Sequence, residues 1–204
     1  GKHAGDTSGE GVRDTVRVAI LPLWNAYNFL VTYARADGWR PSAAAWEHRP
    51  TGELDRWILS RVHGFVGIMR REFEAYSLDR LVPTFLELCD DLNNWYIRRG
   101  RRRYWRSRET DPADKQDAYA TLYRVLVTVV HAIAPVFPFL SESLYYRLVV
   151  EPGLARGVDT DSVHLRPYPE VDEALRDERL EARVATARRI VALGMSLREQ
   201  QRIG

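Results

Sequence analysis

The 204-residue sequence contains one cysteine, Cys89, and this scarcity excludes two kinds of structure. An internal disulfide needs a second cysteine, and a multi-cysteine zinc site needs several. No run of residues approaches the ~18 consecutive apolar residues that a membrane helix requires. Residues 1–11 are polar and glycine-rich, unlike a signal or transit peptide. These absences predict a cytoplasmic protein that makes no membrane contact.

Lysine is also nearly absent. Lys2 and Lys115 are the only lysines among the 30 cationic residues, so the other 28 are arginines. The 28 acidic residues reduce the net charge to +2, but the arginines are unevenly distributed. Seven of them lie between Arg98 and Arg108, with no acidic residue inside that stretch. Because unpaired like charges repel, folding alone does not explain this cluster.

What the sequence does contain is a large apolar and aromatic content. Six Trp, ten Tyr and six Phe, within 45% hydrophobic residues, exclude general disorder. Apolar residues recur every three or four positions along successive segments, and no strand-rich region competes with them. The pattern therefore predicts an all-α protein, a helical bundle of about five helices followed by a charged C-terminal helix. The expected helices cover about residues 12–37, 54–73, 77–106, 112–134, 138–148 and 172–202.

Several residues mark where these helices start and stop. Pro22 predicts a kink or a restart in the first helix, and Asp37-Gly38 predicts its end. Ser77 is a candidate N-cap for the third helix, with Pro83 tolerated in the first turn. Asp111-Pro112 predicts an N-cap followed by proline at the first helical position of the fourth helix.

The chain divides into four parts by composition. Within the part that covers residues 11–150, we expect a loop over residues 41–52. Within the part that covers residues 151–171, we expect a short extended piece over residues 162–165. The apolar pattern near the C-terminus has no stop signal, so we expect that segment to be truncated. The parts are a flexible N-terminal tail over 1–10, a helical bundle over 11–150, a loop or linker over 151–171, and a truncated C-terminal helical segment over 172–204.

No combination of side chains predicts an active site. The five histidines are scattered, without metal-ligand spacing, and no glycine-rich phosphate loop follows a strand. Cys89 lies on an apolar helical stripe, where a packed thiol is expected. Asp90 and Asp91 are adjacent in a helix and point in different directions, so they cannot share a proton. We therefore expect no catalytic, cofactor-binding or metal-binding residue.

The stretch 93–106 is different, because basic and aromatic side chains are interleaved in it. Arginine forms bidentate hydrogen bonds with phosphate oxygens, and Trp or Tyr rings stack on bases. This composition therefore fits binding of RNA better than binding of a membrane or an acidic protein. The alternative is a solvated face that acidic residues elsewhere in the fold neutralise. At ~100° per residue, five arginines share a sector of roughly 140°: Arg98, Arg99, Arg102, Arg103 and Arg106.

Two asparagines in the first helix form a second candidate. Asn25 and Asn28 are of a type that is uncommon inside helices unless the amide has a partner. Their amides can hydrogen-bond base edges, or one of them can bond a neighbouring helix. The residues alone leave both possibilities open.

An ordered set of short motifs resembles the anticodon-binding domain of isoleucyl-tRNA synthetase, a class Ia synthetase. The resemblance covers about residues 12–202 without a large gap, and the sister synthetases for valine, leucine and methionine share the architecture. The strings Leu-Asp-Arg-Trp-Ile-Leu-Ser-Arg and Asn-Trp-Tyr-Ile-Arg-Arg favour isoleucine. The matching segments are 21–29, 37–39, 54–61, 94–99 with the arginines and Tyr104-Trp105 that follow, 114–115, Tyr119 with 121–123, 134–135 with 138–140, and 162–165.

The resemblance places the third helix beside the anticodon stem-loop and implies a role for individual residues. Phosphate contacts are expected from Arg98, Arg101, Arg102 and Arg103. Tyr104 and Trp105 are candidates for stacking on an unpaired base, and Asn25 and Asn28 are candidates for reading base edges.

The resemblance also implies a larger parent enzyme, an ATP-dependent ligase with a Rossmann catalytic domain. Its H-I-G-H and K-M-S-K-S signatures are absent from these 204 residues, so ATP and Mg would bind elsewhere in the parent and this piece would be inactive alone. The expected partners are the anticodon arm of isoleucine tRNA and the missing catalytic and C-terminal domains, with the chain as a monomer. The alternatives are the same domain of a valyl enzyme, or a docking domain with little RNA affinity.

Overall fold

Helices make up nearly all of the regular structure of the computed structural model, which describes residues 16–107, 110–155 and 160–200. No strand occurs among those residues, and the predicted all-α class is confirmed. The predicted tail over 1–10 and the last residues of the predicted C-terminal segment, 201–204, lie outside the described parts. The α-helices are α2 (Leu21–Asp37), α3 (Ala43–Glu47), α4 (Glu53–Glu74), α5 (Leu81–Asp90), α6 (Arg98–Trp105), α7 (Pro112–Ala132), α8 (Pro138–Tyr145) and α9 (Glu178–Gln200).

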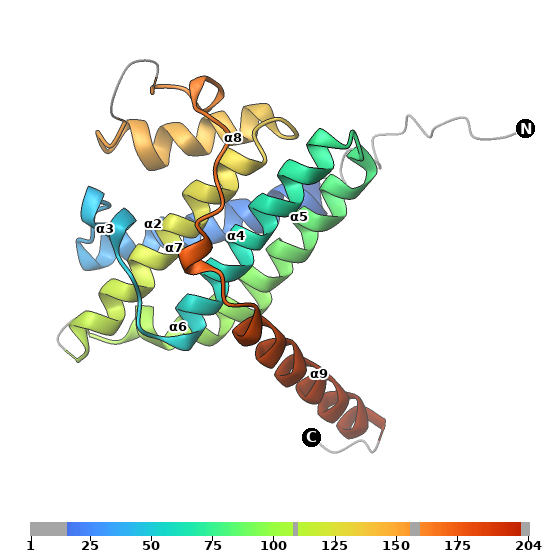
Figure 1. The fold of residues 1–204 in the computed structure, drawn as a ribbon. Helices are drawn as coiled ribbons and strands as arrows, with labels where there is room; N and C mark the ends of the chain where they lie inside the picture. Colours follow the sequence, from blue (N-terminus) through green and yellow to red (C-terminus); the bar gives the residue numbers. More distant parts are fainter. Residues whose placement is uncertain (1–15, 108–109, 156–159, 201–204) are drawn as a thin grey trace, which may run out of the picture.

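Helix α7 is the centre of the bundle. Its second half is mostly apolar, nearly every residue from Ala118 to Ala132 is buried, and α2, α4, α6 and α8 all pack against it. In Figure 1 it runs through the middle of the molecule, with α8 along one end and α4 beside it. A helix that is hydrophobic all round must be covered all round, which explains why one element contacts so many others.

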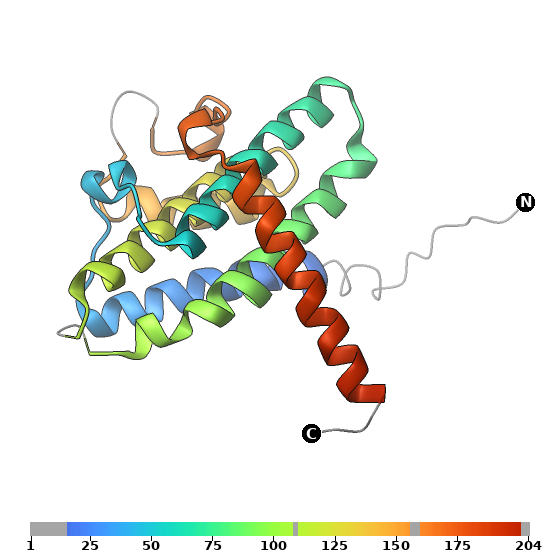
Figure 2. The same ribbon diagram turned by 60° about the horizontal axis from the view of Figure 1, so that its bottom comes forward.

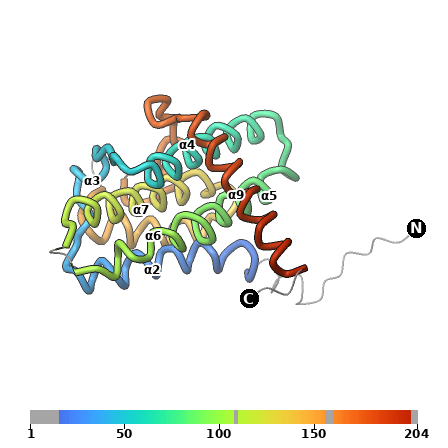
Figure 3. The backbone as a smooth tube through the Cα atoms, turned by 90° about the horizontal axis from the view of Figure 1, so that it is seen from below, coloured from blue at the N-terminus to red at the C-terminus, as the bar shows by residue number. Residues whose placement is uncertain are grey.

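One long helical rod extends from Leu81 to Trp105. Helix α5 passes into a π-helical segment, Asp91–Ile97, and this passes directly into α6, with right-handed helical backbone at both junctions. The single helix predicted over this region is therefore confirmed in outline. Figure 3 shows the rod lying beside α2 on one side of the bundle. Its π-helical turns change which side chains face the core, because a π-helix has more residues per turn than an α-helix.

The predicted helix boundaries are largely confirmed. Gly38 ends α2 with a left-handed φ of 66°, which glycine adopts without strain. The Asp111 side chain accepts a hydrogen bond from the Asp114 amide, and Pro112 is the first residue of α7. Pro22 lies where a π-helical turn, Val16–Ile20, gives way to α2.

Three local predictions were wrong. Ser77 makes no capping hydrogen bond; a 3₁₀ turn, Leu78–Arg80, follows it, and α5 begins at Leu81. The predicted loop over 41–52 contains α3, capped by the Ser42 hydroxyl. The predicted extended piece is a 3₁₀ turn, Val163–Leu165, started by the Ser162 hydroxyl. Each of these three elements is only three to five residues long. Such a segment is too short for the spacing of its apolar residues to show a helical period.

Residues 160–177 return across the bundle and lead into α9. The Asp172 amide donates to His63 Nδ1 (3.0 Å), and Arg70 donates to the Pro169 carbonyl (3.0 Å), so the segment is attached along α4. The first turns of α9 pack on α4, and the rest of α9 extends away from the bundle, as Figure 2 shows. Leu180 is the one buried side chain of α9 among the described residues.

Within the described ranges, no helix has the length and apolar character that crossing a membrane would demand.

Candidate nucleic-acid interface

Five arginines of the predicted cluster form one exposed surface at the end of the rod. Within residues 16–107, 110–155 and 160–200, none of the five has a carboxylate partner. Among those described residues, then, no carboxylate neutralises these five guanidinium groups, contrary to the neutralised-surface alternative. We call this surface the arginine face; it consists of Arg98, Arg99, Arg101, Arg102 and Arg106.

Arg103 does not belong to the arginine face, because its side chain turns into the bundle. Its two terminal nitrogens donate to the two carboxylate oxygens of Asp55 at 2.8 and 2.7 Å, and Nε lies 2.8 Å from Asp114 Oδ1. Asp55 is fully buried. Burial by itself lowers the pKa of Arg103, but the hydrogen bonds and charge of Asp55 outweigh it and raise that pKa above its usual value. This guanidinium joins α6 to α4 and α7, and it is not available for a phosphate.

Tyr104 is also turned inward, and only 3% of it is exposed. Its hydroxyl donates to the Ala118 carbonyl on α7 (2.9 Å), and its ring packs edge-on against Phe29 and Tyr119. Burial raises the pKa of Tyr104 above its usual value. A base cannot stack on a ring that is covered on both sides, so Tyr104 packs α6 onto the bundle instead.

Lys115 holds the C-terminal end of α6 in place. Its side chain is buried, its Nζ donates to the Arg106 carbonyl (2.6 Å), and the same nitrogen pairs with Asp37 Oδ2 (2.7 Å). Carbonyls at a helix end otherwise lack partners, so this contact satisfies one of them. Together with Arg103, it fixes the direction in which the arginine face points.

Two tryptophans accompany the arginine face. Trp105 is 59% exposed, and its indole nitrogen donates to the Tyr33 hydroxyl (2.7 Å), which anchors one edge of the ring. The guanidinium of Arg99 lies over the Trp95 ring, 3.6 Å from its centroid, and that of Arg188 on α9 lies 5.3 Å from it. Trp95 is thus covered by arginines, whereas Trp105 offers an open ring.

Asn25 and Asn28 are both exposed on α2, and neither amide has a partner among the described residues. The possibility that one of them bonds a neighbouring helix is therefore not what the structure shows. Asn25 and Asn94 line the same surface depression between α2 and the rod. The rod also carries Asn93, whose amide donates to the Pro22 carbonyl (3.1 Å) and ties it to α2.

Sequence reasoning placed Trp95 and Arg99 in the basic and aromatic stretch 93–106 without giving either a contact of its own, and it did not select Arg188. The four-residue spacing of Trp95 and Arg99 is a signal for a stacked pair on one helical face. For Arg188 the sequence carries no such signal, because it reaches Trp95 from a distant helix.

The described residues hold no group of three or more His, Cys, Asp or Glu side chains arranged to bind a metal ion. Cys89 is buried, and burial raises the pKa of its thiol to about 12, so it stays protonated at neutral pH.

Comparison with known proteins agrees with this geometry. The chain is 39% identical to an isoleucine–tRNA ligase of Treponema denticola over 95% of its length, and 40% identical to that of Chlamydia abortus over 96%. It spans 18% of the length of each of these relatives. Residues 55–204 match the family described as the anticodon-binding domain of tRNA ligase. The chain therefore belongs to the anticodon-binding domain family of tRNA ligases.

Proposed function

We propose that this chain binds the anticodon stem-loop of isoleucine tRNA and is the anticodon-binding part of an isoleucine–tRNA ligase. The observation that carries the proposal is the arginine face, where five guanidinium groups lack carboxylate partners among the described residues. Phosphates of a nucleic acid backbone are the natural partners of such groups, since each guanidinium binds two phosphate oxygens at once.

Phosphate contacts and base contacts would come from different residues. Arg98, Arg101 and Arg102 supply affinity and orientation, because phosphates carry no sequence information. Trp105 stacks on an unpaired base of the loop, since its ring is open and one edge is fixed by Tyr33. Asn25, which lines the depression beside the rod, and Asn28, also exposed on α2, present to base edges amides that have no partner among the described residues.

The buried contacts of α6 serve this function by holding the arginine face rigid. Arg103 and Lys115 attach both sides of α6 before RNA arrives, so binding does not have to order the helix. In the parent ligase, binding energy from the anticodon arm would then orient the distant acceptor end at a catalytic domain that binds ATP and Mg.

The test is the affinity of the 204-residue chain for an isoleucine tRNA transcript, measured at several salt concentrations. Each phosphate contact contributes about 0.7–0.9 to the slope of log affinity against log salt. We expect a steep negative slope, which Arg102→Ala reduces by about one contact. The matched control is Arg147→Ala, an exposed arginine on the π-helical turn after α8, which should leave the slope unchanged.

A second comparison addresses recognition of the anticodon. Trp105→Ala, Asn25→Ala and Asn28→Ala should change the preference between isoleucine and valine tRNA transcripts, whereas Arg102→Ala should weaken both alike. A flat salt dependence, or no binding at low salt, would mean that the domain mainly docks the catalytic core. A preference for the valine transcript would support the valyl alternative.

A further inference from the structure

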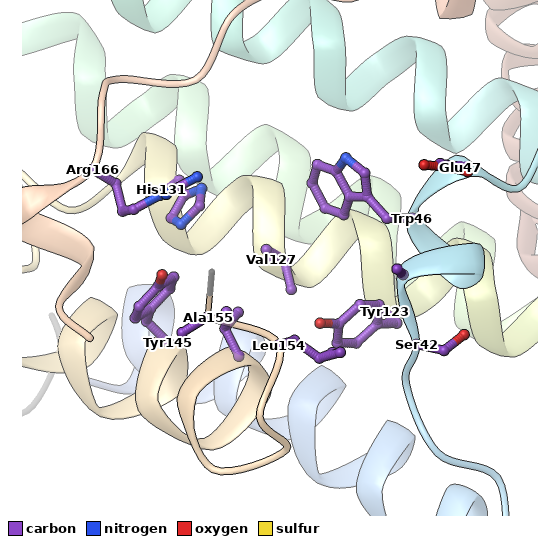
Figure 4. A pocket seen from close by; sticks show the side chains of 12 residues that line it. Ser42, Trp46, Glu47, Tyr123, Val127, His131, Tyr145, Leu154, Ala155 and Arg166 are labelled. Carbon is purple, nitrogen blue, oxygen red and sulfur yellow. The ribbon is translucent and has the colours of Figure 1, made fainter. Parts of the chain in front are cut away.

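A cavity of about 250 Å³ lies between α3, α7 and α8, and it shares no residue with the arginine face. Figure 4 shows aromatic side chains around it: Trp46 from α3, Tyr123 from α7 and Tyr145 from α8. The lining is mainly apolar, and Val127 forms part of its wall. A cavity of this size holds one or two fused rings and is smaller than typical drug-sized sites.

The tyrosine hydroxyls of this cavity are already used by the protein. Tyr123 donates to the Leu148 carbonyl (3.1 Å), and Tyr145 donates to the Thr160 carbonyl (2.7 Å). Both therefore present rings rather than hydrogen-bonding groups to the cavity. On its outer side, the Trp46 ring lies 5.3 Å from the guanidinium carbon of Arg124. The walls are thus fixed aromatic and aliphatic surfaces.

One polar atom at the cavity has no partner. His131 Nε2 is buried and makes no hydrogen bond to any described residue, and its ring lies 5.1 Å from that of Tyr145. Burial, together with the nearby charge of Arg166, lowers the pKa of His131 to about 4. The imidazole is therefore neutral at pH 7 and can donate a hydrogen from Nε2. A buried polar atom without a hydrogen-bond partner is costly, and native proteins rarely leave one unmatched.

Arg166 stands at the same end of the cavity. Figure 4 shows its side chain beside the His131 ring. Among the described residues, this guanidinium has no carboxylate partner. Glu47 lies at the opposite end of the cavity, beyond Trp46. Arg166 therefore favours an anionic group at the His131 end, where the charges of Glu142 and Asp161 also act on Tyr145, and this sets the orientation of an occupant.

We propose that this cavity is a binding site for a small aromatic carboxylate. Its ring lies against Trp46, Tyr123 and Tyr145, and its carboxylate oxygens accept hydrogen bonds from the Arg166 guanidinium and, once the buried imidazole turns toward the cavity, from His131 Nε2. This arrangement gives one partner to the imidazole nitrogen and to the guanidinium, neither of which has a hydrogen-bond or carboxylate partner among the described residues. The site is independent of RNA binding, since none of its residues belongs to the arginine face.

The experiment uses 2-naphthoate as the probe and the 204-residue chain as the protein, with calorimetry for affinity. We expect saturable one-to-one binding, and binding at least about tenfold weaker for 2-naphthamide, which keeps the ring and lacks the charge. Arg166→Gln should weaken 2-naphthoate by a similar factor, and Arg147→Gln, the matched exposed arginine, should not. His131→Phe keeps an aromatic ring and removes Nε2, and it should also weaken binding.

The location of the bound probe is read from the methyl NMR signals of Val127, which should shift on binding. Because Arg166 is exposed, its replacement leaves the fold intact, and circular dichroism checks this for both variants. The proposal is overturned if 2-naphthoate does not bind, if the amide binds equally well, or if Arg166→Gln and His131→Phe leave the affinity unchanged. It is also overturned if binding shifts signals of the arginine face and not those of Val127.

Discussion

Arg102 and Arg103 are neighbours in the chain, and their guanidinium groups meet opposite environments. Arg102 is exposed and has no carboxylate partner among the described residues, whereas Arg103 pairs with the fully buried Asp55 and with Asp114. The same side chain therefore serves RNA binding at one position and the stability of the fold at the next.

This contrast predicts different results from two alanine substitutions. Arg103→Ala should lower the free energy of unfolding by about 3–5 kcal/mol, because it leaves the charge of Asp55 buried without its counterion. Arg102→Ala should change that free energy by less than about 0.5 kcal/mol, as expected for an exposed side chain. Urea unfolding of both variants measures the difference. Equal stability of the two would show that the Asp55 pair contributes little to the fold.

At the scale of the element, two glycines inside helices have different reasons to be there. Gly100 in α6 is buried, and a Cβ added to it would lie 3.8 Å from Tyr104 Cε2, an ordinary contact. Gly64 in α4 faces the guanidinium of Arg176, and an added Cβ would lie 2.0 Å from its Nη1. That nitrogen donates to the Ser60 carbonyl (3.0 Å) and to Glu181 (2.9 Å). Of these two glycines, only Gly64 lies where an added Cβ would displace a neighbouring side chain.

Alanine at these two positions should therefore have opposite effects. Gly100→Ala should raise the free energy of unfolding by about 0.5–1 kcal/mol, because alanine favours the helix and meets no obstacle. Gly64→Ala should lower it by about 1 kcal/mol, since displacement of Arg176 breaks charged hydrogen bonds worth more than the gain in helix propensity. Thermal and urea unfolding of the two variants are the measurements. Stabilisation by both would show that Arg176 moves aside without cost.

Long periodic elements were predictable, and short or exceptional ones were not. The period of apolar residues identified α4 and α7, and Asp111-Pro112 located the start of α7. Helix α3 has five residues, too few to show a period, and the π-helical segment Asp91–Ile97 lies within an apolar pattern that predicted an ordinary helix. The rod was predicted as one helix, yet its π-helical turn alters the side-chain directions that a regular 100° wheel assigns.

At the scale of the molecule, the C-terminal part of the chain is held to the bundle in two ways. Residues 160–177 contact α4, and α9 forms ion pairs with the rod. Arg188 pairs with Asp90 (2.6 Å) and with Asp91, which also accepts a hydrogen bond from Arg61 (2.7 Å). Beyond these contacts, α9 exposes apolar residues, among them Ile190 and Leu193. Residues 160–177, which lead into α9, are themselves attached to α4 through His63 and Arg70.

That attachment predicts a loss of stability in mild acid. Burial and the charge of Arg124 lower the pKa of His63 to about 4, and its Nδ1 accepts the Asp172 amide hydrogen, which a protonated imidazole cannot do. Because the folded pKa lies below the unfolded value of about 6.5, His63 favours folding fully above pH 6.5. This contribution is lost progressively as the pH falls from 6.5 towards 4.

Unfolding free energies at pH 6.5, 5.8 and 5.0 are the measurement. We expect a decline of up to ~1.4 kcal/mol per pH unit for each such histidine, His131 included. His63→Asn keeps an acceptor for the Asp172 amide and does not titrate, so its decline should be visibly shallower. An identical decline in the variant would show that His63 is not responsible. The groups facing His63 are Arg49, Arg124, Asp172 and Arg176.

The sequence by itself determined the helical class, most helix ends, the family and the existence of an arginine-rich helix. These follow from local order: apolar spacing, capping residues and the composition of one short stretch. It also selected Arg98, Arg101, Arg102 and Trp105, all of which are exposed in the structure.

Only the tertiary structure decided which members of the cluster face solvent. Asp55, which turns Arg103 inward, lies 48 positions away in the sequence, and Arg188 reaches Trp95 from α9. The cavity with the unpaired His131 likewise requires α3, α7 and α8 together. Partners so far apart in the chain leave no periodic trace, because their pairing depends on how the helices pack and not on local spacing.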